Sequence, residues 1–179
     1  MLTAPLPTAA SHAAVEFPGD GRRVVIRALR PEDRAGLVAA FERISTQSVY
    51  RRFFAVRRHF SDAEVSFLLN PDFTNHVALV ATTYEDGVQA IIGAGRYVVT
   101  APDRAEVAFM VIDAYQGQHI GSTLLHHLIE IAREAKLDML TAEVLAENIP
   151  MLKVFGHCGL SMRTRHEAEV VHVTLTLPR

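Results

Sequence analysis

A glutamate within an apolar segment, followed by a glycine-containing turn, is the part of this sequence best suited to chemistry. Residues 105–112 read Ala-Glu-Val-Ala-Phe-Met-Val-Ile and predict a buried strand with one ionisable side chain, Glu106. Residues 116–121 then read Gln-Gly-Gln-His-Ile-Gly and lead into a helical pattern of apolar residues. A strand, turn and helix in this order direct free backbone N–H groups and the positive end of the helix dipole at one point, which suits a phosphate. We therefore predict an enzyme that uses a phosphorylated cofactor beside a half-buried carboxylate.

The other periodic segments predict the elements that must hold this strand and turn. Predicted strands span residues 22–30, 76–83, 88–100, 139–145 and 162–177, and predicted helices begin near Pro31, Val49, Ser61, Ile120 and Asn148. A helix separates the strands at 105–112 and 139–145, so these two strands are expected to run parallel through a right-handed crossover. The element order predicts an α/β (α+β) fold, a mixed sheet with helices on both faces. A doubly wound dinucleotide-binding fold would alternate strands and helices more regularly.

The beginning of the chain differs in composition from the rest. Residues 1–21 are rich in Ala, Pro, Ser and Thr without a sustained period, and they predict a flexible leader. The length of residues 22–179 fits a single domain that can bury a sizeable core.

The composition argues against several classes of protein and partner. The net charge of −2 offers no basic surface for nucleic acid, and no apolar run is long enough to span a membrane. Cys158 is the one cysteine, which excludes an intrachain disulfide and a cysteine-based metal cluster. The nine histidines include no His-x-x-x-His pair, so we expect surface histidines and no metal. A single cysteine and the lack of a signal peptide predict a cytoplasmic protein.

Residues 116–121 resemble the acyl-CoA pyrophosphate loop of the Gcn5-related N-acetyltransferase (GNAT) superfamily, which has Gln or Arg, two residues, Gly, one residue, then Gly or Ala. Residues 147–160 are similar to the superfamily's fourth-helix segment, in which the residue matching Asn148 commonly contacts the pantetheine region of CoA. The resemblance extends over residues 24–177. It implies acetyl-CoA as cosubstrate, no metal, and a mostly antiparallel sheet with one parallel strand pair splayed at the cofactor site.

Three further segments, residues 26–33, 48–54 and 145–151, resemble the catalytic domain of bacterial protein lysine acetyltransferases that modify acyl-CoA synthetases. This closer likeness implies direct acetyl transfer to a lysine on an acyl-CoA synthetase or another protein, by a monomer or a homodimer. Two alternatives stay open. The acceptor could be a small amine, or the chain could be a non-catalytic acyl-CoA-binding regulatory module.

Glu106 matches the glutamate that acts as general base in the closer family. A lysine amine with a pKa near 10.4 is almost wholly protonated at pH 7, and freeing it costs roughly 4–5 kcal/mol. A base beside the amine reduces this cost, and the apolar neighbours of Glu106 would desolvate its carboxylate and favour that role. The alternatives are Glu143 as the base, or a structural Glu106 that pairs with Arg96 or Arg104.

The resemblance also assigns the cofactor contacts. A backbone N–H between Met110 and Ile112 would donate to the thioester carbonyl, and the N–H groups of Gln118–Ser122 would hold the pyrophosphate. The predicted cofactor-binding residues are Met110, Val111, Ile112, Gln116, Gly117, Gln118, His119, Ile120, Gly121, Ser122, Asn148, Met151 and Phe155.

Two of these residues depart from the superfamily pattern. His119 stands where glycine is usual, and a positive φ there would strain the chain by about 1 kcal/mol or more. We favour a place in the first helical turn, where His119 would be harmless. Phe155 replaces a tyrosine that protonates the leaving thiolate in many members, so that role is vacant or filled by water.

The segment from Tyr50 to Arg58 combines aromatic and basic residues and is a candidate wall for the acceptor groove. The alternative that we favour is a core helix in which Phe53 and Phe54 pack inward while the arginines stay in solvent. Cys158 has apolar neighbours in the last predicted helix, so we interpret it as a structural residue and not as a nucleophile.

Overall fold

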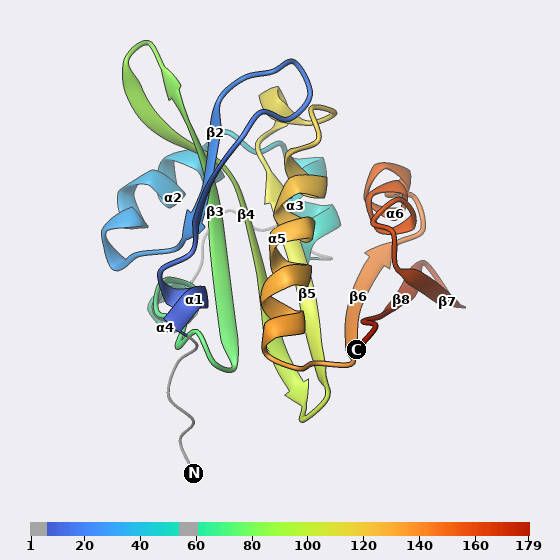
Figure 1. The fold of residues 1–179 in the computed structure, drawn as a ribbon. Coiled ribbons are helices and arrows are strands. Elements are labelled where there is room, and N and C mark those ends of the chain that lie inside the picture. The colour runs from blue at the N-terminus through green and yellow to red at the C-terminus, as the bar shows by residue number, and fades with distance from the viewer. Residues whose placement is uncertain (1–6, 54–60) are drawn as a thin grey trace.

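Eight strands, most of them rich in Val, Ile and Ala, form one sheet in the computed structural model, which describes residues 7–53 and 61–179 (Figure 1). Only the pair β5–β6 is parallel; the other neighbouring strands pair antiparallel. The strands, in their order across the sheet, are β1 (Ala13–Glu16), β2 (Val24–Ala28), β3 (His76–Glu85), β4 (Val88–Ala101), β5 (Arg104–Val111), β6 (Met139–Leu145), β8 (Val170–Thr176) and β7 (Ser161–Glu167). The predicted mixed sheet is confirmed.

Helices cover both faces of this sheet (Figure 1). The long helix α5 packs on β3, β4 and β5 from one face, and α2 and α3 lie over the other. The helices are α1 (Pro7–Ala10), α2 (Arg34–Glu42), α3 (Thr46–Phe53), α4 (Asp62–Leu69), α5 (Ile120–Glu134) and α6 (Ile149–Gly156), with short 3-10 turns η1 (Pro31–Asp33) and η2 (Asp113–Tyr115).

Local contacts fix several of these elements. Ser61 and Glu64 form the capping box of α4, through a bond from Glu64 N to Ser61 Oγ at 3.2 Å and one from Ser61 N to Glu64 Oε2 at 2.8 Å. The apolar stripe of α5, led by Leu124 and Leu128, is buried. At Gly95, a Cβ would lie 2.8 Å from the Phe109 ring, so β4 approaches β5 and α5 more closely than a larger residue allows.

The parallel pair β5–β6 is short, and this creates the opening in the sheet. Residues 104–106 pair with residues 139–141, as the crossover through α5 predicts, and the ladder ends at Glu106 and Thr141. Beyond that point the two strands diverge, while β5 stays paired with β4 as far as Val111. The N–H and C=O groups on one edge of β5 therefore have no strand partner between the two strands.

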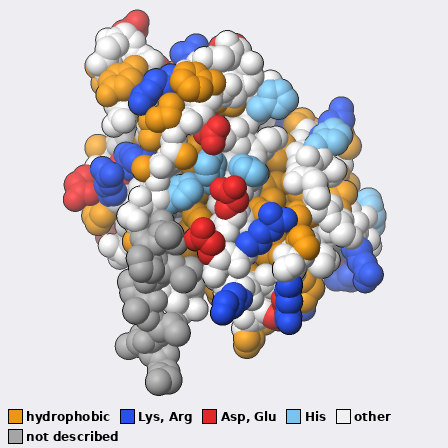
Figure 2. All heavy atoms as spheres, viewed as in Figure 1, with side chains coloured by type: hydrophobic (Ala, Val, Ile, Leu, Met, Phe, Trp, Pro, Cys, Tyr) orange, Lys and Arg blue, Asp and Glu red, His pale blue; other side chains and the backbone are white. Residues whose placement is uncertain are grey.

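The structure differs from the predicted flexible leader over residues 7–21, and residues 1–6 lie outside the described part. The segment forms α1 and then β1, which pairs antiparallel with β2. His12 Nε2 lies 3.0 Å from His127 Nδ1 on α5, and His127 Nε2 lies 2.8 Å from Glu16 Oε1. Figure 2 shows histidine and acidic side chains together on this face. The four residues of β1 are too few to show a recognisable strand pattern. They form a strand because folding places β2 and α5 beside them.

His76, at the start of β3, is a neutral buried imidazole that makes stability depend on pH. Burial above all, and Arg96 next, lower the pKa of His76 to about 4, while Asp72 opposes the shift. The residue is 5% exposed, and its ring stacks on Phe67 with centroids 4.5 Å apart. Between pH 6.5 and pH 4 the unfolded chain binds a proton that the folded chain does not, so stability is lost as the pH falls.

We expect the free energy of unfolding to fall by about 2 kcal/mol between pH 7 and pH 5 through His76 alone. Urea denaturation at both pH values measures this change. His76→Phe keeps the stack on Phe67 and should remove this share of the pH dependence. The control His126→Ala, at a side chain that is 65% exposed, should retain it. An equal loss in His76→Phe and the wild type would contradict the assignment.

Candidate active site

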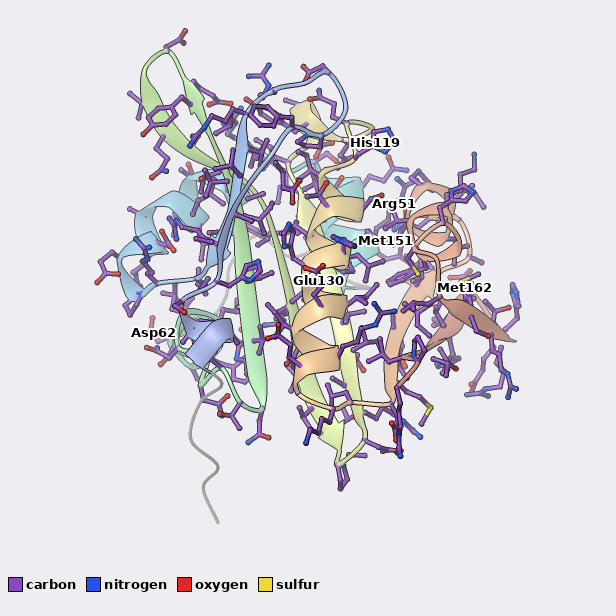
Figure 3. All side chains as sticks on the ribbon, viewed as in Figure 1. Arg51, Asp62, His119, Glu130, Met151 and Met162 are labelled. Carbon is purple, nitrogen blue, oxygen red and sulfur yellow. The ribbon has the colours of Figure 1, made fainter. Side chains whose placement is uncertain are left out.

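A cleft of about 820 Å³ lies where β5 and β6 diverge, and we call it the β5–β6 cleft. Its walls come from β5, β6, α3, the start of α5, and α6. Figure 3 shows Arg51, His119 and Met151 around this opening. Of the predicted cofactor residues, eleven line it: Met110, Val111, Gln116, Gly117, His119, Ile120, Gly121, Ser122, Asn148, Met151 and Phe155. Ile112 and Gln118 are not among the residues that line it.

The connection from β5 to α5 forms an anion site at one end of the β5–β6 cleft. The first intrahelical bond runs from Thr123 N to His119 O at 3.0 Å, so the N–H groups of Ile120, Gly121 and Ser122 have no partner within the helix. They point out of the positive end of α5, a fifteen-residue helix. Gln116 Nε2 donates to Val111 O at 3.0 Å and to Ser48 Oγ at 3.1 Å, which fixes the loop against β5 and α3.

His119 is the N-cap of α5 and has a left-handed backbone, with φ 63° and ψ 15°. Our expectation of a harmless place in the first helical turn is therefore wrong. Residue type does not reveal this, because the backbone angle is set by how the chain must turn from β5 into α5. A histidine with this left-handed backbone conformation is about 1–2 kcal/mol less favourable than a glycine at the same position. The imidazole itself is exposed beside the cleft.

We expect His119→Gly to raise the free energy of unfolding by about 1 kcal/mol, because it relieves a positive φ. Gly117→Ala is the matched opposite change. Gly117 has φ 75° and open space where a Cβ would lie, so alanine should lower the free energy of unfolding through backbone strain alone, again by about 1 kcal/mol. Denaturant unfolding of both variants tests the pair. Acetyl-CoA affinity of His119→Gly should be equal or better; a tenfold loss, about 1.4 kcal/mol, would instead mean that the imidazole contacts the cofactor.

Glu106 lies on β5 at the last pair of the β5–β6 ladder, and its side chain lines the β5–β6 cleft. The expected half-buried carboxylate is not observed: Glu106 is exposed, because the strand that would cover it diverges there. Within the described residues it forms no ion pair with Arg96 or Arg104. It does act electrostatically on Arg96 and on Arg52. The alternative base, Glu143 on β6, is also exposed in the cleft, with Oε1 3.4 Å from His172 Nδ1.

The direction of each N–H group decides which of the predicted backbone donors on β5 faces the opening. Ile112 N–H donates to Ile92 O at 3.0 Å, so it is already used towards β4. Successive residues of an antiparallel strand point their N–H groups to opposite sides. The N–H of Met110, paired opposite Ala94, therefore points to β4 as well, whereas that of Val111 points into the gap. Of the three predicted candidates, Val111 is the one placed to donate to a ligand.

Helix α6 closes the opposite wall of the β5–β6 cleft. Asn148 caps it as predicted, with Oδ1 accepting from Met151 N at 3.4 Å. Phe155 is 1% exposed, and its ring centroid lies 6.0 Å from that of Phe109. This packing gives the phenylalanine a structural role in the cleft floor. Cys158 lies just after α6, and not inside it as predicted, and is a half-buried free thiol.

Two arginines lie within electrostatic reach of Glu106, and the sequence did not predict that either would line a cavity. Arg52 on α3 is half-buried, against the expectation that these arginines stay in solvent, and Phe53 and Phe54 have no described side chains. Burial chiefly, and the nearby Arg96 next, lower the pKa of Arg52 to about 10. Arg96 could have been found: it stands among apolar residues of an alternating strand, where a charge signals either a partner or a site.

Neither a metal site nor a membrane span is found in the described ranges. Within residues 7–53 and 61–179, no three His, Cys, Asp or Glu side chains gather closely enough to hold a metal ion. No helix there combines the length and apolarity needed to cross a membrane.

Comparison with known proteins agrees with this geometry. Acetyltransferase Pat of Mycolicibacterium smegmatis is 31% identical over 160 residues, which cover 88% of this chain and 47% of Pat. Acetyltransferase PA5475 of Pseudomonas aeruginosa is 35% identical over 120 residues, which cover 66% of this chain and 64% of that protein. The chain thus matches about half to two thirds of the length of these relatives. The crystal structure of the GNAT domain of S. lividans PAT superimposes with a TM-score of 0.82, at 35% identity, over 92% of this chain and 97% of that one.

The family model described as the acetyltransferase (GNAT) domain matches residues 23–161, which include β5, the anion site and α6. The chain therefore belongs to the acetyltransferase (GNAT) family.

Proposed function

We propose that the protein acetylates a lysine side chain of another protein, with Glu106 as the general base. The observation that carries this proposal is the meeting of three groups in one cleft: the exposed Glu106 carboxylate, the free Val111 N–H and the anion site at the start of α5. The likeness to PAT catalytic domains supports a protein acceptor. A lysine on an acyl-CoA synthetase is the acceptor that we propose to test first. We place the reaction in the cytoplasm, a reducing compartment in which the free thiol of Cys158 would persist.

Each group has a separate task in the proposed reaction. The N–H groups of Ile120, Gly121 and Ser122 bind the pyrophosphate of acetyl-CoA, and the N–H of Val111 donates to the thioester carbonyl as it gains negative charge. Glu106 takes a proton from the lysine ammonium, directly or through water. The amine nitrogen then bonds to the carbonyl carbon, the C–S bond breaks, and CoA leaves as a thiolate. The nitrogen loses its second proton as the amide forms, and the thiolate takes up one proton; since Phe155 has no hydroxyl, we assign this transfer to water.

Labelled acetyl-CoA tests this function. The protein is incubated with acetyl-labelled acetyl-CoA and a purified acyl-CoA synthetase, and spermidine serves as a small-amine competitor. We expect label on a synthetase lysine and one CoA released for each acetyl group transferred. Label on spermidine alone would assign a small-amine acceptor, and acetyl-CoA binding without CoA release would assign a non-catalytic module. Either result would overturn the proposal.

A further inference from the structure

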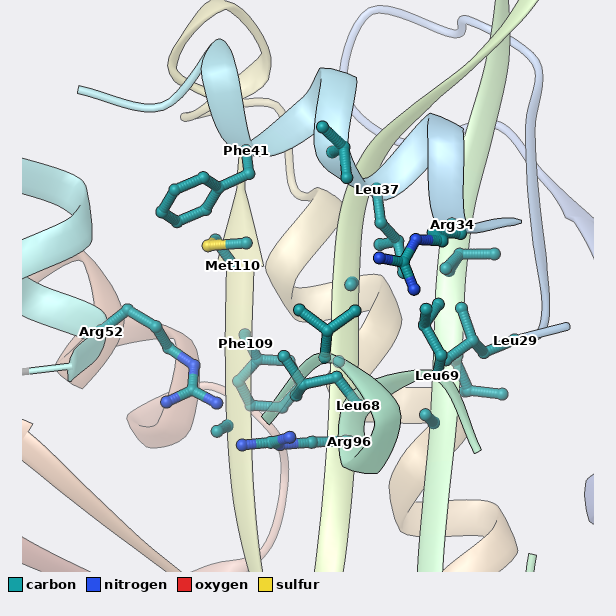
Figure 4. Close-up of a pocket in the computed structure, with 18 of the residues that line it drawn as sticks. Leu29, Arg34, Leu37, Phe41, Arg52, Leu68, Leu69, Arg96, Phe109 and Met110 are labelled. Carbon is teal, nitrogen blue, oxygen red and sulfur yellow. The ribbon is translucent and has the colours of Figure 1, made fainter. Parts of the chain in front are cut away.

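A second cavity of about 580 Å³ lies behind the sheet, and we call it the arginine cavity. Helices α2 and α4 roof it, and β3, β4 and β5 form its floor (Figure 4). Most of its lining is apolar, from Leu37, Phe41, Leu68 and Phe109 among others. It shares Arg52 and three consecutive residues of β5, Ala108 to Met110, with the β5–β6 cleft. The two cavities therefore meet at the strand that carries Glu106.

Positive charge predominates in this apolar space. Arg34, Arg52 and Arg96 line it, against the single carboxylate of Glu42. In Figure 4, Arg52 from α3 and Arg96 from β4 extend their guanidinium groups towards each other across β5. Burial is the main cause that lowers the pKa of both arginines, and Glu106 acts against that shift in each. Two guanidinium groups therefore lie within electrostatic reach of the same carboxylate, Glu106, where the two cavities meet.

Arg96 carries the strongest sign of a missing anion. Its NH1 nitrogen is buried, and it has no hydrogen-bond partner in the described part of the chain. Its guanidinium lies 5.5 Å above the centre of the Phe67 ring, a contact that holds the side chain without using its N–H donors. A buried guanidinium donor without a partner is costly, so this arrangement favours a ligand that supplies an acceptor. A carboxylate matches the forked N–H geometry of arginine.

We propose that the arginine cavity binds an acidic side chain of the acceptor protein, next to the lysine that is acetylated, with Arg96 as the principal contact and Arg52 as the second charge. This inference rests on the proposed function, because it takes the lysine to lie at Glu106. The apolar walls would accept hydrophobic residues that flank the acidic one. Acceptor lysines with an Asp or Glu and a large apolar residue nearby are therefore preferred over lysines in basic segments.

Matched peptides test the preference. Two acceptor peptides differ only in a Glu or a Gln beside the lysine, and kcat and KM are measured for the wild type, Arg96→Gln and Arg96→Lys. We expect the wild type to have at least a tenfold lower KM for the Glu peptide, Arg96→Gln to lose this preference, and Arg96→Lys to keep part of it. Arg133→Gln, an exposed arginine on α5, should behave as the wild type. Equal KM values for both peptides in the wild type, or a preference that survives in Arg96→Gln, would overturn the proposal.

A binding measurement separates this inference from the proposed function. Calorimetry without acetyl-CoA compares 4-phenylbutyrate with the neutral 4-phenylbutanol. The wild type should bind the carboxylate at least tenfold more tightly, and Arg96→Gln should not distinguish the two. If this holds while no peptide is acetylated, carboxylate binding in the arginine cavity stands and the protein-lysine acceptor fails. If peptides are acetylated and the carboxylate is not preferred, the proposed function stands and carboxylate binding in the arginine cavity fails.

Discussion

Glu106→Gln is expected to lower kcat/KM for a lysine acceptor by about 10²–10⁴-fold at pH 7, the usual contribution of a general base. The amide keeps the size of the carboxylate but cannot accept the ammonium proton. In the variant the reaction depends on the small fraction of lysine that is already neutral, so its rate should rise about tenfold per pH unit towards the lysine pKa near 10.4. Steady-state rates between pH 6.5 and 9.5 measure both effects.

Glu143→Gln is the matched control, because Glu143 is exposed in the same cleft on the opposite strand. We expect it to remain within a few-fold of the wild type. Acetyl-CoA affinity should be unchanged in Glu106→Gln, since Glu106 lies on β5 and not at the anion site formed by Ile120–Ser122. Full activity of Glu106→Gln at neutral pH would remove Glu106 as the base, and a large loss in Glu143→Gln alone would transfer the role.

A carboxylate placed at residue 121 should abolish tight acetyl-CoA binding. In Gly121→Asp the new side chain competes with the pyrophosphate for the N–H groups at the start of α5 and repels its charge. We expect the dissociation constant for acetyl-CoA to rise at least tenfold, about 1.4 kcal/mol, and the loss to shrink at high salt. Fluorescence or calorimetric titration at low and high ionic strength measures it.

Gly121→Ala separates the charge from the added volume. A Cβ at this position would meet only Val111 and Val154 side-chain carbons, each at 4.0 Å, which is ordinary contact. Alanine should therefore bind acetyl-CoA nearly as the wild type does. Folding should be retained in both variants, since an acidic residue in the first helical turn is favourable for the helix. Equal losses in the two variants would mean that the anion site lies elsewhere.

The fold and the cleft could be predicted from sequence wherever short-range chemistry decides the structure. Period-two segments joined by Asp86-Gly87 predict the β3–β4 hairpin, and both turn residues have positive φ, as that turn requires. The helical stripe of α5 between two apolar strands predicts the parallel pair β5–β6. Asn148 before Pro150 predicts the start of α6.

The features that could not be predicted depend on contacts between distant segments. Residues 13–16 become a strand because β2 offers an edge and α5 offers His127. The exposure of Glu106 follows from the length of the β5–β6 ladder, which no residue near Glu106 encodes. Arg96 appears in the sequence as an arginine in a strand; its place opposite Arg52 depends on how α3 packs against β5.

A crystal structure of the protein with acetyl-CoA is the most direct test of the account. We predict the pyrophosphate within hydrogen-bond distance of the N–H groups of Ile120, Gly121 and Ser122, the thioester carbonyl on the N–H of Val111, and the acetyl carbon facing Glu106. The β5–β6 cleft would then hold the whole cosubstrate and leave the arginine cavity free for the acceptor. Density for the pyrophosphate in the arginine cavity, or a thioester directed away from Glu106, would contradict it.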